Sequence, residues 1–196
     1  MKDVKLEDLR PTQFTHGERE VERKRKEYAA LTGHALQMAI AEKPIPIVLG
    51  PKGAPFATDH HHVAMALHRA GIDRAPVVLL CDFSSMDPAG FWLELENRRW
   101  AHPYDAKGER QPFNTMPEHI HQTTDDENRS LAAFVRDAGG YEKTTVALEE
   151  FRWADFFRHH LPRLGGKDDK FDARVKRGVE LAHSELALGL PGYRPR

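Results

Sequence analysis

The chain has 196 residues and a mass of 22.3 kDa, the size of one ordinary domain or of one domain with an extension. Its 29 Lys and Arg against 30 Asp and Glu give a formal net charge of −1, so no global positive field favours binding to a nucleic-acid backbone. With 40% hydrophobic and 9% aromatic residues, the composition is too apolar for a disordered chain.

Three features of the sequence favour a cytoplasmic protein without a membrane segment. No apolar run approaches the roughly 18 residues that a transmembrane helix requires. Residues 1–10 alternate in charge and lack the apolar stretch of a signal peptide. The one cysteine, Cys81, cannot form an internal disulfide or a thiolate zinc cage, and we expect it to be a small buried residue rather than a nucleophile.

The first third of the chain predicts helices followed by a hairpin. Apolar residues recur at helical spacing from about 17 to 42, between alternating acids and bases, with Gly33 as a candidate break between two helices. Residues 45–49 are rich in β-branched side chains and predict a strand. A Gly-Pro turn at 50–53 then leads to a second short strand at 55–58.

The next segment alternates helix, strand and helix. Apolar residues at 63–70 share one helical face, and Gly71 follows as a C-terminal cap. Residues 77–80 predict a buried strand. Asp87 and Pro88 then mark the cap and first residue of a helix.

The second half predicts a loop and three helices. Prolines and glycines make 101–123 an ordered loop, after which Thr124 is expected to cap a helix that ends at Gly139. Further helices are expected at about 148–160 and 171–188. We therefore predict one domain over residues 1–196, with a core at 5–100, a loop and helices at 101–160, and a helical tail at 161–196.

The strongest candidate site is residues 58–62, where a predicted strand leads into a helix. Thr58 and Asp59 can cap this helix, whose unsatisfied N–H groups and positive dipole end favour phosphate or carboxylate. His60, His61 and His62 can add donors or a proton-transfer group near neutral pH. Successive helical residues point about 100° apart, so the three rings cannot converge on one metal ion. The alternative is that these histidines are structural or simply exposed.

Other residues are weaker candidates. Asp82 and Ser84 follow a predicted strand, where open α/β layers often place ligand groups. Arg129 and Ser130 lie one turn into a predicted helix and can face a phosphate, although the acids before them are explained by capping alone. His119 and His121, like the pair at 159–160, could join a metal site only through long-range contacts.

Several motifs, taken together, resemble a known family. They are the segments at 9–13, 21–31, 45–51, 59–62, 82–84, 91–92, 129–132 and 150–154. Over about residues 5–160 the chain resembles the putative ParB-like nuclease family of the ParB/sulfiredoxin superfamily. The resemblance implies an α/β fold, with a small mixed sheet, helices and a helical C-terminal extension. It also implies nucleotide phosphates bound at the loop that enters a helix, which is Asp59–His62 here.

The resemblance implies roles for individual residues through their positions in the family pattern. His61 matches a histidine shared by the sulfiredoxin and free-serine-kinase versions of the loop. His60 stands where sulfiredoxin has its cysteine, which argues against sulfinic-acid reduction. His62 replaces the usual arginine, which argues against ParB-like CTP switching.

Residues before this loop complete the resemblance. Glu18 and Glu20 lie near the position of a catalytic carboxylate in the serine-kinase branch, although a solvated helix face explains them as well. Arg10 and Gln13 align with the Arg-Pro segment that approaches the nucleotide, and Lys24 is a further phosphate partner.

Our leading hypothesis is an enzyme that binds ATP, ADP or AMP at 58–62, with Mg²⁺, for phosphoryl transfer or phosphoester hydrolysis on an unknown substrate. His60 and His61 would hold or protonate phosphate oxygens, and Glu20 or Glu18 would act as the base. One alternative is a metal-dependent nuclease that uses Asp59, His61 and Asp82. Another is a non-catalytic nucleotide sensor or partner-binding module. The near-neutral charge favours a small nucleotide over DNA.

Overall fold

The computed structural model describes residues 2–161 and 170–195. The chain forms two compact units, Met1–Asp125 and Asp126–Arg196. The division falls at neither of the internal boundaries expected from the sequence, near 100 and near 160. Among the described residues, no helix combines the length and apolar character needed to cross a membrane.

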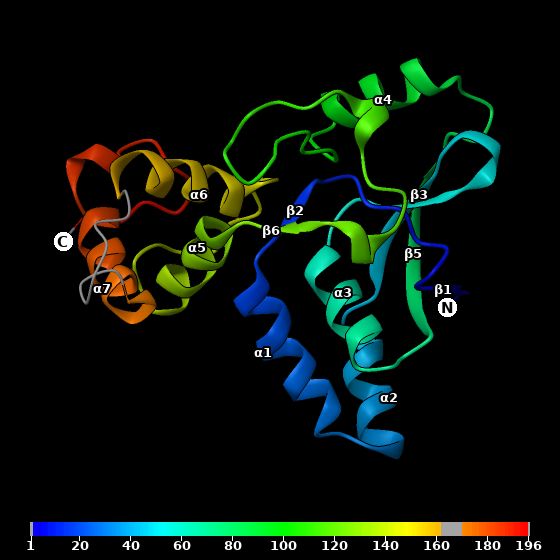
Figure 1. Cartoon of the computed structure of the whole chain (residues 1–196), viewed down its shortest axis with the longest axis horizontal. Coiled ribbons are helices and arrows are strands. Elements are labelled where there is room, and N and C mark those ends of the chain that lie inside the picture. Colours follow the sequence, from blue (N-terminus) through cyan, green and yellow to red (C-terminus); the bar gives the residue numbers. More distant parts are fainter. Residues whose placement is uncertain (1, 162–169, 196) are drawn as a thin grey trace. The chain divides into compact units, whose positions relative to one another are not determined.

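The first unit is a small mixed sheet with helices, as expected from the sequence (Figure 1). In chain order it contains β1 (Lys2–Lys5), β2 (Thr15–His16), α1 (Glu18–Ala29), α2 (Gly33–Ala41), β3 (Ile45–Leu49), η1 (Pro51–Gly53), β4 (Pro55–Ala57), α3 (His61–Arg69), β5 (Arg74–Asp82), α4 (Pro88–Asn97), η2 (Phe113–Thr115), η3 (Ile120–Gln122) and β6 (Thr124–Asp125). The main sheet has the order β1-β5-β3-β4, in which only β3 and β5 are parallel. A second, two-stranded sheet pairs β2 with β6 in parallel.

Local patterns predicted several of these elements, although not the strands β1, β2 and β6. The hairpin is confirmed, with Val48 opposite Phe56 in the antiparallel pair β3–β4. The long helical segment divides in two, with α2 beginning at Gly33. Asp87 caps α4 by accepting hydrogen bonds from two backbone N–H groups, and Pro88 is the first helical residue. Each of these features depends on residues close together in the chain.

The main sheet packs against helices through two separate clusters. Ile45, Ile47 and Val77 join a core with α1 and α3 that contains the buried Val21 and Val63. The neighbouring Val48 belongs to a second cluster, with Phe56 of β4 and Phe91 and Leu95 of α4. Successive strand residues point to opposite faces, and a register shift lies between Ile47 and Val48.

The expected buried strand at 77–80 is a strand, but its burial is confirmed only for Val77. Val78, Leu79 and Leu80 are 41%, 52% and 42% exposed. The neighbouring strand β1 is short and pairs with β5 only from Arg74 to Val77, so among the described residues no strand pairs with the rest of β5 on that side. Cys81, expected to be buried, is half-buried beside the second cluster.

The second unit contains α5 (Glu127–Asp137), α6 (Glu149–His160), α7 (Phe171–Ala182) and η5 (Glu185–Ala187). Leu131, Trp153 and Phe157 are fully buried in its core. Thr124 was the expected cap of α5, and this was wrong. Asp126 caps the helix instead, accepting from the backbone N–H of Asn128, because Thr124 is already part of β6.

Candidate functional site

The chain enters α3 through a sharp turn at His60. The backbone N–H of Thr58 donates to Pro46 O, which extends the β4 pairing to the start of the turn. His60 is the N-cap residue in the left-handed conformation, with φ 58° and ψ 26°. Neither Thr58 nor Asp59 caps the helix as we expected. The Asp59 carboxylate instead accepts from the N–H of His60, at 2.6 Å, because the helix begins one residue later than the pattern indicated.

His61 ties the first turn of α3 to the segment before β2. Its Nε2 accepts a hydrogen bond from the backbone N–H of Thr12 at 3.0 Å, and the residue is 5% exposed. A backbone N–H can only donate, so Nε2 holds the lone pair and the proton of the neutral ring lies on Nδ1. The Thr12 hydroxyl donates to Ala57 O at 2.7 Å. Thr12 was not predicted as a site residue, and its only sequence signal is its place beside the Arg-Pro motif.

Glu20 is brought to the same end of α3, because α1 packs against α3. Its Oε1 lies 3.7 Å from Nε2 of His62. The Glu20 residue is 5% exposed, whereas the His62 side chain is 22% exposed. The structure thus gathers an acid and an imidazole beside residues 58–61, from two helices that are far apart in sequence.

Glu18 is held in a different arrangement. Its carboxylate accepts from Arg69 and lies 2.9 Å from Nε2 of His16, a buried residue that was not predicted. The hydrogen bond from Arg69 is the main reason that the pKa of Glu18 lies below its usual value; His16 adds to the effect and partial burial opposes it. A carboxylate with a lowered pKa is a weaker base. The pairing with Arg69 therefore makes Glu18 a poor candidate base.

His16 also contacts Thr123, with 2.9 Å between Nδ1 and Oγ1. The line Thr123–His16–Glu18 has the order of a nucleophile triad. However, the Thr123 hydroxyl donates to Ile120 O and the residue is buried. A buried hydroxyl within hydrogen-bond distance of a backbone carbonyl is poorly placed to attack a substrate. These contacts hold α1 to the segment before β6.

Three more predicted phosphate partners have their side chains engaged elsewhere in the first unit. The Arg10 guanidinium lies 5.7 Å from the centre of the Phe56 ring. Gln13 Nε2 donates to Thr15 O at 2.6 Å. Lys24 pairs with Glu27 at 2.7 Å and lies over the Tyr28 ring. Arg10 and Gln13 flank Thr12 and so lie near the start of α3 by their backbone, whereas nothing in these contacts brings Lys24 there.

Comparison with known proteins identifies the family. A family model described as "Putative ParB-like nuclease" matches residues 2–159. The chain belongs to this family. The crystal structure of protein Atu1540 from Agrobacterium tumefaciens is similar over 100% of this chain and 98% of that chain, with 36% identity and a TM-score of 0.87. No curated protein matches the chain significantly.

A second solved structure is the C-terminally truncated chromosome-partitioning protein ParB from Caulobacter crescentus complexed to the centromeric parS site. It shows 14% identity over 94% of this chain and 93% of that chain, with a TM-score of 0.33.

Asp82 and Ser84 of this ParB-like chain do not lie with residues 58–62. His60 contacts Pro44 O, just before β3, whereas Asp82 pairs with Leu49 at the other end of β3. At about 3.3 Å per residue, the strand separates the two places by more than about 13 Å. The structure thus does not bring together Asp59, His61 and Asp82. Within residues 2–161 and 170–195, no group of three His, Cys, Asp or Glu side chains could hold a metal ion.

Arg129 and Ser130 are buried in α5 of the second unit. Arg129 lies 3.6 Å from a Glu150 carboxylate oxygen and over the Phe151 ring, both in the same unit. These contacts explain the two residues as part of the helical core. Their expected role at a phosphate stays a prediction.

Proposed function

We propose that this ParB-like protein binds a nucleotide by its phosphates at the start of α3, and transfers or hydrolyses a phosphoryl group there. The observation that carries the proposal is the backbone turn at His60. A left-handed residue followed by helical residues directs successive N–H groups into one concavity, which suits an anion. The His60 N–H is bonded to Asp59, so the proposal relies on the N–H groups that follow it. The positive end of the helix dipole adds to this preference.

The side chains around the turn supply donors and acceptors for a phosphate. His60 Nδ1 lies 2.9 Å from Pro44 O, and a carbonyl only accepts, so Nδ1 carries the proton. Nε2 of His60 then donates to a phosphate oxygen only after taking up a second proton. His62 and Thr58 add further polar groups at the same turn. We therefore expect nucleotide binding to take up protons near neutral pH.

Two carboxylates, Asp59 and Glu20, border the proposed site and oppose the charge of a bare phosphate. Mg²⁺ bound to a nucleotide would relieve this repulsion, because it is normally held by one or two carboxylates together with phosphate oxygens and water. Among the described residues, no three side chains form a metal site. We therefore propose that the Mg²⁺ ion binds together with the nucleotide. Glu20, next to His62, is our candidate to accept a hydroxyl proton from the acceptor substrate.

The binding test is calorimetry with ATP, ADP, AMP and CTP, each with and without Mg²⁺. Because His61 supports the fold through Thr12, replacing it would confuse binding with folding. His62→Ala and Asp59→Asn are better probes, and His34→Ala, at an exposed position on α2, is the matched control. We expect at least one nucleotide to bind, and His62→Ala to weaken it about five- to tenfold while His34→Ala has no effect. If none of the four binds, the proposal is wrong.

The catalytic part is tested separately, by following phosphate and nucleoside diphosphate release. Glu20→Gln should keep nucleotide binding and lose turnover, since the amide has the shape of the acid but cannot act as a base. Binding without turnover in the unaltered protein would indicate a sensor and overturn the catalytic claim. Plasmid cleavage with Mn²⁺, without nucleotide binding, would favour the nuclease alternative instead.

A further inference from the structure

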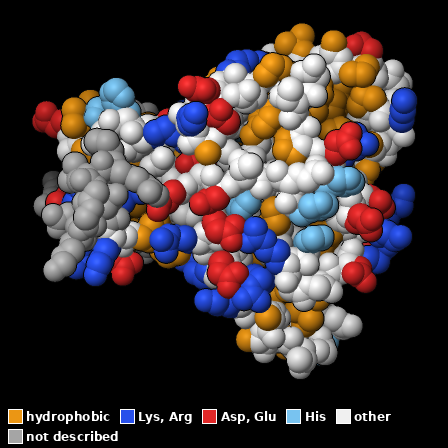
Figure 2. All heavy atoms as spheres, in the orientation of Figure 1, with side chains coloured by type: hydrophobic (Ala, Val, Ile, Leu, Met, Phe, Trp, Pro, Cys, Tyr) orange, Lys and Arg blue, Asp and Glu red, His pale blue; other side chains and the backbone are white. Residues whose placement is uncertain are grey.

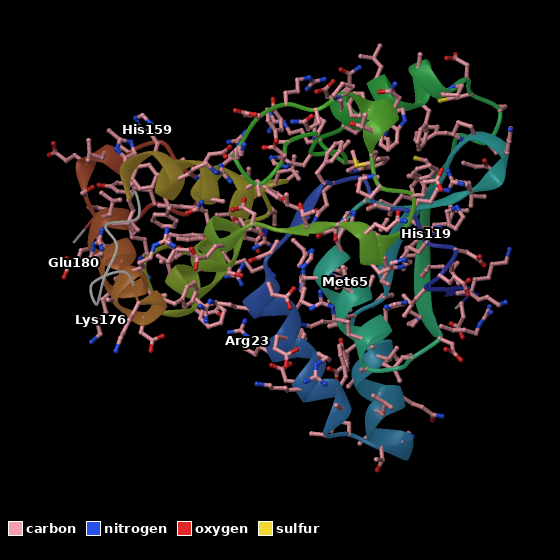
Figure 3. All side chains as sticks on the ribbon, viewed as in Figure 1. Arg23, Met65, His119, His159, Lys176 and Glu180 are labelled. Carbon is pink, nitrogen blue, oxygen red and sulfur yellow. The ribbon has the colours of Figure 1, made fainter. Side chains whose placement is uncertain are left out.

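Three histidine rings are stacked on the surface of the first unit. His68, near the end of α3, lies 5.2 Å from His121 of η3, with 16° between the ring planes. His121 in turn lies 5.3 Å from His119, with 8° between the planes. Figure 2 shows histidine side chains gathered on this face of the molecule, and His119 is labelled in Figure 3. The proposed function does not use this cluster.

The stack fastens one end of the segment 118–125, which we call the strap. His119 Nδ1 donates to Glu7 O at 2.8 Å. The Gln122 side chain accepts from the N–H groups of Glu118 and His119, at 3.0 Å each, which closes the turn. Ile120 is buried in the core with α3. The stack, this turn and one apolar side chain thus hold this end of the strap.

The other end of the strap contacts the start of α1. Thr123 bonds to His16, and the N–H of Thr124 donates to Phe14 O at 3.0 Å. The Asp125 carboxylate accepts from the N–H of Glu18, at 2.9 Å, in the first turn of α1. Through these bonds, the position of the strap and that of the first turn of α1 are coupled.

When the three rings are protonated, the charges around the stack are mostly positive. The pKa of His121 is lowered by loss of hydration against its neighbours, and then by His68 and His119, with only Glu7 acting in the opposite direction. Glu118 is the other acid of this end of the strap. At the other end, the strap faces His16, Glu18 and Arg69, together with its own Asp125.

We propose that the strap is a proton-operated latch, which is stacked on α3 at neutral pH and released as its histidines gain protons. Two protonated rings at these spacings repel each other, whereas neutral rings stack. Release of the strap would weaken the hydrogen bonds between Thr123 and His16 and between Asp125 and Glu18. Glu18 lies two residues before Glu20, so the change would reach the first turn of α1. The latch rests on the geometry of the stack and does not require the proposed nucleotide site.

The first test is a histidine NMR titration of the whole unaltered chain, combined with amide hydrogen exchange. We expect His121 to titrate at lower pH than His34, an exposed reference on α2. Corrected for the intrinsic rates, exchange at Gln122, Thr123 and Thr124 should rise about tenfold between about pH 7.5 and about pH 5.5. If His121 gains its proton at the same pH as His34, or at a higher pH, the proposal is wrong.

The second test compares two matched variants. His121→Phe keeps a ring in the stack but removes its proton site, so exchange in the strap should no longer depend on pH beyond the intrinsic rates. His34→Phe, made at the reference position, should keep the full response. A response that persists in His121→Phe contradicts the latch. If that variant does not fold, the titration and the hydrogen exchange of the unaltered chain together decide the question.

Discussion

His61 and Thr12, 49 positions apart, are joined by a 3.0 Å hydrogen bond from the backbone N–H of Thr12 to the His61 ring. The bond fixes the first turn of α3 against residues 10–13. The family resemblance marks His61 as a site histidine, yet one of its nitrogens is committed to the protein's own backbone. We therefore expect the backbone of this turn, and the rings of His60 and His62, to contact the phosphates.

Replacing His61 by Ala should lower the free energy of unfolding by about 1–3 kcal/mol, because it leaves the buried Thr12 N–H without its acceptor. Thr12→Val keeps the backbone N–H and removes the hydroxyl, which donates to Ala57 O and lies 3.3 Å from His61 Nε2; it should cost less, about 0.5–1.5 kcal/mol. Urea unfolding at neutral pH measures both. A His61→Ala protein as stable as the unaltered chain would show that the bond contributes little.

The Glu18–Arg69 pair should stabilise the fold at neutral pH and stop doing so in acid. The pKa of Glu18 is lowered in the folded state from its usual 4.5, chiefly by Arg69. A lowered carboxyl pKa contributes stability that is present above the unfolded value and is lost as the pH falls through the folded one. Arg69→Gln should therefore lower the urea midpoint at pH 7, with a difference that shrinks below about pH 4.5. A difference that stays constant with pH would contradict this.

Arg99→Gly should stabilise the first unit. Arg99 follows α4 with φ 57°, and the next N–H, of Trp100, donates back to Leu95 O, which is the position where glycine normally ends a helix. Removing the side chain relieves the left-handed strain, for a net gain of about 0.5–1 kcal/mol. Asn97→Gly, inside the helix, is the control and should give no gain. Thermal unfolding distinguishes the two.

Gly178→Ala should destabilise the second unit, although alanine is the better helix former. In a free helix the change would gain about 1 kcal/mol. In α7, however, an added Cβ would lie 2.6 Å from Val135, a stiff and fully buried side chain. We expect a loss of about 1–3 kcal/mol by urea unfolding, largely recovered in the double variant with Val135→Ala. A stabilised Gly178→Ala protein would show that α5 and α7 adjust freely.

Features set by neighbouring residues were predictable from the sequence. The β3–β4 hairpin, the division before Gly33, and Asp87 with Pro88 at the start of α4 all followed from local patterns. The family membership was also visible, because its motifs are spread along the chain in order. Local conformational preference acts over a few residues, and a single sequence displays it directly.

Contacts between distant segments were decided only by the tertiary structure. No pattern placed Thr12 beside His61, Glu20 beside His62, or His68 beside His121. Each of these depends on how helices and loops pack, which is settled by the whole core. The sequence by itself determined most helices, the β3–β4 hairpin and which residue types gather at the start of α3. The fold decided which of those residues support the structure, because burial and hydrogen bonds to distant segments depend on tertiary packing.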